Sequence, residues 1–141
     1  MTLKEMYNLQ YDTSGHNYGL IIWYNELLDK TYDDLIALDV YRMFTQDVIK
    51  NLAISKAIEM LLINPYDGYF YDGEFLALLV SSASSIKKET NLSELKRTLQ
   101  HVKQEYETFE WLDEESKRQY AINLDKMLGI LSYRKATLEG V

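Results

Sequence analysis

The stretch NPYDGYFYDGEFLALLV (residues 64–80) decides where two elements of this chain end and begin. It contains the only proline of the sequence, Pro65, which disfavours a helical conformation at the residue before it. Asp67 and Gly68 form a turn dipeptide, and Asp72 has the side chain of a helix N-cap. The stretch is therefore interpreted as a turn between two buried helices.

Apolar residues on both sides of this turn recur at helical rather than alternating spacing, which predicts an all-α fold. A central helix is expected over residues 38–64, with a bend near Asn51, where two shorter helices would meet. Steps of three and four predict an amphipathic helix that starts near Leu92. Asp113 and the acids after it are expected to start the last helix, whose buried line is Tyr120, Leu124, Met127, Leu128 and Leu131.

The length of 141 residues is enough for one shared hydrophobic core. We expect a compact single-domain bundle of about five to six helices that spans residues 1–141. Residues 1–17 are polar and rich in turn formers, so they are expected to form a loop or a loosely docked arm.

The composition excludes several classes of function. The chain has no cysteine, which excludes disulfides, thiolate metal sites and cysteine nucleophiles, and only His16 and His101 could supply imidazole ligands. No apolar run has the length of a signal peptide or a membrane span, so we expect a cytoplasmic protein without membrane contact. A net charge of −7 argues against direct nucleic-acid binding and favours a basic protein partner.

A calcium loop is one alternative for the opening stretch, because Asp67, Asp72 and Glu74 lie near glycines. The spacing argues against it, since Tyr69 and Tyr71 occupy the third and fifth positions, where an EF-hand loop needs oxygen ligands. The serine cluster at residues 81–85 lacks the surroundings of a nucleophile elbow, and His101 lies beside an apolar helical stripe. We therefore expect no enzymatic activity, no cofactor and no metal site.

The charges are unevenly distributed along the chain. No Lys or Arg occurs between Lys56 and Lys87, and none occurs in residues 105–115, where six acids surround Phe109 and Trp111. One interpretation is a solvated helix junction whose acids match helix dipoles. The other is an acidic face with aromatic anchors that speeds encounter with a basic protein.

Residues 38–79 resemble the core pattern of a family of immunity proteins from bacterial contact-dependent growth inhibition (CDI) systems, and the resemblance covers about residues 31–80. In that family an Asp-Val-x-Arg segment leads into a helix, an Asn/Asp-Pro turn follows, and a Tyr-Asp-Gly-Glu helix start comes next. The pair Phe44-Thr45 and the aromatic Phe75 depart from the pattern. The matching residues in this chain are Asp39, Val40, Arg42, Asn64, Pro65, Tyr71, Asp72, Gly73, Glu74 and Leu76.

The resemblance implies a cytosolic helical protein that binds the C-terminal toxin domain of a large delivered effector and catalyses nothing. We expect this domain to be a basic nuclease. A helical adaptor or regulatory protein that binds another basic partner remains the alternative. The partner-binding surface predicted from the charges, named here the acidic rim, consists of Asp67, Tyr69, Asp72, Glu105, Glu107, Glu110, Trp111 and Asp113.

Overall fold

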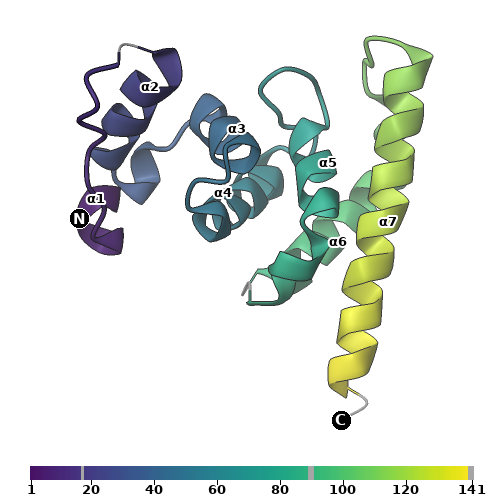
Figure 1. The fold of residues 1–141 in the computed structure, drawn as a ribbon. Coiled ribbons are helices and arrows are strands. Elements are labelled where there is room, and N and C mark those ends of the chain that lie inside the picture. The colour runs from purple at the N-terminus through teal and green to yellow at the C-terminus, as the bar shows by residue number, and fades with distance from the viewer. Residues whose placement is uncertain (17, 89–90, 140–141) are drawn as a thin grey trace.

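Helices and their connections make up the whole of the described chain (Figure 1). The structure is a computed structural model that describes residues 1–16, 18–88 and 91–139, and no strand occurs among them. The all-α prediction is confirmed, with seven α-helices in this part of the chain instead of five or six. They are α1 (Leu3–Tyr7), α2 (Gly19–Leu28), α3 (Ala37–Thr45), α4 (Lys50–Ile63), α5 (Glu74–Ser81), α6 (Leu92–Val102) and α7 (Glu114–Glu139), and the 3-10 helices are η1 (Tyr32–Asp34), η2 (Ala83–Lys88) and η3 (Tyr106–Thr108).

The N-terminal segment is not all loop, so the prediction for residues 1–17 needs correction at its start. Thr2 caps α1: its N–H donates to Glu5 Oε1 at 3.1 Å, and the Glu5 N–H donates to Thr2 Oγ1 at 3.3 Å. Leu3 is fully buried, and its N–H donates to the Lys30 carbonyl oxygen at 2.8 Å. The capping box and this one apolar anchor dock α1 against the end of α2.

The expected central helix is two helices, α3 and α4, separated a few residues before Asn51. Between them Asp47 and Ile49 have φ values of 54° and 45°, and such left-handed residues cannot continue an α-helix. The predicted stop before Pro65 is confirmed, because α4 ends at Ile63 and the next residue is extended. The short break lets α3 pack against α4.

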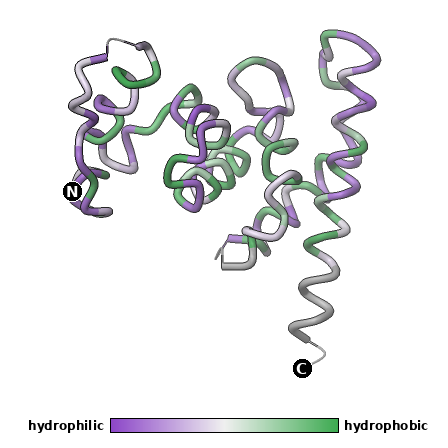
Figure 2. Tube along the Cα trace, in the orientation of Figure 1, coloured by the Kyte–Doolittle hydropathy of each residue, from purple (hydrophilic) through white to green (hydrophobic). Residues whose placement is uncertain are grey.

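The helices follow one another in a row from the N-terminus to the C-terminus (Figure 1). α4 contacts both α5 and α6, and α7 packs along the same two helices. Hydrophobic and hydrophilic residues alternate along the helices in Figure 2, as expected for helices with one buried side. α7 buries Tyr120, Leu124, Met127 and Leu131 as predicted, while Leu128 is only partly buried.

Candidate functional site

The loop of residues 64–73 and the segment of residues 103–113 lie together at one end of the fold, where α5 and α7 begin (Figure 1). The Tyr66 ring stacks on Phe109 with 4.0 Å between ring centroids and meets Trp111 edge to face at 5.5 Å. The edge-to-face contact is a favourable geometry for an aromatic pair. These rings join the two segments into one surface.

Tyr120 of α7 holds the loop from the protein interior. Its side chain is buried, and its hydroxyl donates to the Pro65 carbonyl oxygen at 2.9 Å. Burial raises the pKa of Tyr120 far above its usual value, because the phenolate would be poorly solvated there. The hydroxyl therefore stays protonated and remains a hydrogen-bond donor to the loop.

Gly73, rather than Asp72, is the N-cap of α5, so the N-cap prediction is wrong. Gly73 has φ 88°, and its N–H donates to the Tyr66 carbonyl oxygen at 2.7 Å. A Cβ at this position would lie 2.6 Å from Tyr120 Cδ1. The close approach and the positive φ both require glycine. Asp72 is exposed and makes no hydrogen bond or ion pair with the described residues.

A buried carboxylate fixes the tip of the loop. Glu74 Oε1 accepts hydrogen bonds from the N–H groups of Tyr69 at 2.7 Å and Phe70 at 3.0 Å. Tyr41 of α3 supports the same tip, with its ring edge to face against Phe70 at 4.8 Å. This carboxylate, which the sequence analysis weighed as a metal ligand, is a structural element of the loop. The Tyr-Asp-Gly-Glu pattern contained it but gave no signal for its bonding partners.

The structure brings the two halves of the acidic rim to the same end of the molecule. Tyr69, Asp72 and Trp111 line one hollow of about 300 Å³. Asp72 and Asp113 line a neighbouring hollow of about 330 Å³ between the loop and α7. The other rim residues lie outside both hollows: Asp67 is partly buried in the loop, and Glu105, Glu107 and Glu110 are exposed.

Two members of the rim have structural contacts of their own. Trp111 is partly buried, and its indole N–H donates to the Tyr106 carbonyl oxygen at 2.7 Å. Asp113 accepts the Ser116 N–H at 2.7 Å at the start of α7, and hydrogen bonds from Ser116 lower the pKa of Asp113. Tyr66, which lies beside the rim, has a raised pKa, mainly because the ring is partly buried and to a smaller extent because Glu105 is negatively charged. The rim is therefore partly built from residues that also hold the two segments in place.

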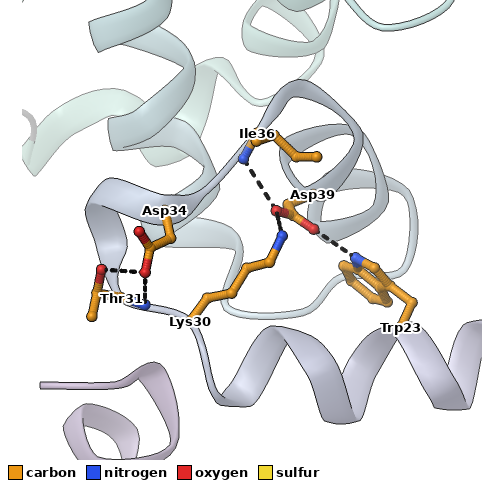
Figure 3. Close-up of polar contacts among 6 residues, drawn as sticks. All are labelled: Trp23, Lys30, Thr31, Asp34, Ile36 and Asp39. Atoms are coloured by element: carbon orange, nitrogen blue, oxygen red, sulfur yellow. Dashed lines mark hydrogen bonds and ion pairs between the residues drawn. The ribbon is translucent and has the colours of Figure 1, made fainter.

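A second polar cluster joins α2 to α3 at the other end of the row. The Asp39 carboxylate, 2% exposed, accepts from Trp23 Nε1 at 2.9 Å, Lys30 Nζ at 2.7 Å and the Ile36 N–H at 3.1 Å (Figure 3). The Arg42 guanidinium lies 5.7 Å from the centre of a Trp23 ring. The Asp-Val-x-Arg segment thus clamps two helices together, and we name this cluster the Asp39 clamp.

The sequence matches one known family. A family model described as CDI immunity proteins matches residues 5–102, more than two thirds of the chain. The chain belongs to the family of CDI immunity proteins. No curated protein matches its sequence.

The family match includes the features that build the scaffold of this immunity protein. It covers the Asp39 clamp and the loop of residues 64–73, and it ends at the last residue of α6. Residues 103–113 and α7 lie beyond it. Across the described residues of this CDI immunity protein, no helix is both long and apolar enough to cross a membrane. The same residues include no group of three or more His, Asp or Glu side chains arranged to hold a metal ion.

Proposed function

We propose that this immunity protein binds and neutralises the C-terminal toxin domain of a CDI effector, and that this domain is a nuclease with a basic substrate-binding surface. The observation that carries the proposal is membership of the CDI immunity family. The protein acts in the cytoplasm as one domain, by occupying the surface of its partner and without catalysis. Its net charge of −7 supports a basic partner.

The acidic rim is the proposed toxin-binding surface. Its two segments are joined by the Tyr66, Phe109 and Trp111 rings, so their charges act on a partner from one end of the molecule. Residues 104–116 contain no Lys or Arg that would neutralise these charges from within the segment. A concentrated negative surface attracts a positively charged protein and raises the rate of productive encounter.

The exposed glutamates of the rim lie beyond the family match, which supports the same assignment. Asp39 and Glu74 are buried, and both lie inside the family match with their hydrogen-bond partners. Glu105, Glu107 and Glu110 are exposed and follow the match. Exposed residues can change between members without loss of the fold, and such residues are the ones that determine which partner is bound.

Co-expression tests the function directly. We expect the gene beside this one to encode the end of a large effector, and the C-terminal domain of that effector is produced with a tagged copy of the immunity protein. We expect copurification in a fixed stoichiometry and survival of cells that the toxin domain alone would kill. A protein that copurifies with a different basic partner and gives no protection would instead be an adaptor or regulatory protein.

Charge reversal tests the rim. The double variant Glu107→Lys and Glu110→Lys should lower the association rate constant at low salt by about tenfold, because steering depends on the local potential. Stopped-flow or surface plasmon resonance measures the rate over a series of salt concentrations. The difference from the wild type should shrink as salt rises, because salt screens exposed charges.

A matched double variant controls for net charge. Glu26→Lys in α2 with Asp33→Lys in η1 reverses the same number of exposed acids. Figure 1 shows α2 at the opposite end of the row from α7, beside whose start the rim lies. This control variant should slow association much less than the rim variant does. Equal rates for the two double variants would show that only total charge matters and would remove the rim from the proposal.

A further inference from the structure

An exposed apolar surface that charge alone did not reveal lies beside the acidic rim. Tyr69, Phe70 and Tyr71 follow one another at the loop tip, and Phe70 is 66% exposed. Leu112, 87% exposed, lines the same hollow of about 300 Å³ from the other segment. We name these residues the apolar ridge. Single exposed apolar side chains are ordinary, but several around one hollow are typical of an interaction surface.

Two of the four ridge residues, Tyr69 and Phe70, are held in place before any partner arrives. Glu74 fixes the backbone of Tyr69 and Phe70, and the Tyr41 ring supports both side chains, with 5.9 Å to Tyr69 and 4.8 Å to Phe70 between centroids. A preorganised surface loses little conformational entropy on binding, so more of the contact energy appears as affinity. The hydrogen bonds of buried Glu74 thus hold the backbone of two residues whose aromatic side chains are exposed to water.

Negative charge lies next to the ridge. Tyr71 and Asp72 line both hollows, and Asp113 and Glu115 line the one beside α7. Glu115 is paired with Arg118, whereas Asp72 has no partner among the described residues. No Lys, Arg or His is found among the described residues that line the two hollows. The surface therefore combines aromatic faces with uncompensated carboxylates.

This combination suits an arginine of a protein partner. The guanidinium group stacks on aromatic faces and pairs with carboxylates, and its aliphatic stem covers apolar surface. A second copy of this chain would place like charges opposite each other, because the molecule carries −7 and the ridge is flanked by acids. The charge complement is a basic protein.

We propose that the apolar ridge is the energetic centre of the toxin interface, and that an arginine of the toxin domain enters the hollow between Tyr71 and α7 beside Asp72 and Asp113. This inference rests on the proposed function. It differs from steering by the exposed glutamates, because it places the contacts that slow dissociation at Phe70, Leu112 and Asp72. Central, desolvated anchors dominate interface energies, whereas charges at the edge mainly change the association rate.

Matched alanine variants test the ridge in calorimetric titrations with the isolated toxin domain. Phe70→Ala and Leu112→Ala should each raise Kd about tenfold or more, mainly through faster dissociation. Tyr18→Ala, at the same 66% exposure as Phe70, and Ile63→Ala, at 83%, are the controls, and neither residue lines the two hollows. Both controls should leave Kd within about twofold of the wild type.

The charge contact is tested with Asp72→Asn and Asp72→Lys. Both substitutions should raise Kd, the lysine more than the asparagine, because it repels the arginine as well as removing the carboxylate. Urea unfolding of every variant separates lost binding from lost folding. Leu112 remains informative if Phe70→Ala unfolds, since Leu112 is almost fully exposed.

The possible outcomes separate the two proposals. A wild-type protein that neither binds the toxin domain nor protects cells overturns the proposed function. A wild type that binds, with ridge variants that bind equally well, overturns only the ridge. Sedimentation equilibrium identifies the remaining occupant: if Leu112→Ala changes self-association and leaves toxin binding intact, the ridge is a contact between copies of this chain.

Discussion

Asp39 is the residue on which the junction between α2 and α3 depends. Its carboxylate accepts from an indole, an ammonium group and a backbone amide, so Asp39→Ala leaves three donors without their acceptor. We expect a loss of about 3 kcal/mol in the free energy of unfolding, near the lower end for broken buried pairs. The Lys30 side chain is 30% exposed, so water partly replaces the missing partner there.

Urea unfolding followed by circular dichroism measures that loss. Asp33→Ala is the control, since Asp33 is exposed and makes no hydrogen bond or ion pair among the described residues. It should change the unfolding free energy by less than about 0.5 kcal/mol. Equal effects of the two substitutions would contradict a structural role for the clamp.

Gly73 and Gly129 should respond in opposite ways to substitution by alanine. Gly73→Ala should cost at least about 2 kcal/mol, since alanine is strained at φ 88° and its Cβ would collide with Tyr120. Gly129 lies in α7 with nothing near its missing Cβ, so Gly129→Ala should stabilise by about 0.5–1 kcal/mol. Thermal unfolding measures both, and a tolerated Gly73→Ala would contradict the described packing of Tyr120 on the loop.

At the scale of the element, the loop of residues 64–73 depends on Glu74. Glu74→Ala should speed amide hydrogen exchange at Tyr69 and Phe70 by about tenfold or more, since these N–H groups lose their acceptor. Glu74→Gln keeps a side-chain oxygen that can accept both bonds and should stay closer to the wild type. Exchange is followed by NMR or mass spectrometry, with Glu107→Ala as the control at an exposed acid. Unchanged exchange in Glu74→Ala would contradict the role of the Glu74 hydrogen bonds at the loop tip.

Some helices can be predicted from the sequence and others cannot. The stripe in α6 and the buried line of α7 were predictable because helical periodicity reports directly which side is covered. α1 was missed because one buried side chain, Leu3, produces no periodic pattern. The exact break between α3 and α4 was missed because Asp47 and Ile49 adopt left-handed backbone angles, which are uncommon for Asp and rare for a β-branched residue such as Ile.

For the candidate site, the gap in basic residues identified both segments of the acidic rim, and the structure places them together. Their function in binding stays a prediction. Sequence reasoning gave Asp72 the N-cap role because the side chain suits it, but contacts with Tyr66 and Tyr120 set the turn at Gly73 instead. Sequence reasoning considered Glu74 as a possible metal ligand. Its actual role could not be predicted, because its hydrogen bonds depend on how the loop folds back.

At the scale of the whole molecule, the helix and turn caps predict a shared response to acid. Hydrogen bonds from nearby Thr and Ser residues lower the pKa of four exposed carboxyl groups, on Glu5, Asp12, Asp34 and Asp113. The unfolded chain therefore binds protons at higher pH than the folded chain does. The contribution of these four carboxylates to stability should be fully present above the ordinary pKa values of 4.5 for Glu and 3.8 for Asp. It should be lost as pH drops through their lowered folded-state pKa values.

Urea unfolding as a function of pH measures this response. Asp34→Asn with Asp113→Asn should flatten the profile below about pH 4.5, because two of the titrating groups are gone. Asp33→Asn with Glu107→Gln removes two exposed acids that make no hydrogen bond with the described residues, and it should leave the profile close to the wild type. Parallel profiles for the two double variants would show that the caps do not cause the acid response.

The anchor of the loop on Tyr120 has a consequence for chimeric immunity proteins. Tyr120 belongs to the part of the chain beyond the family match, while the backbone it supports at Pro65 and Gly73 belongs to the part within it. A loop transplanted from this protein without Tyr120 would lose that support. If the loop binds the toxin domain as proposed, recognition should be transferred only when the loop and α7 are exchanged together.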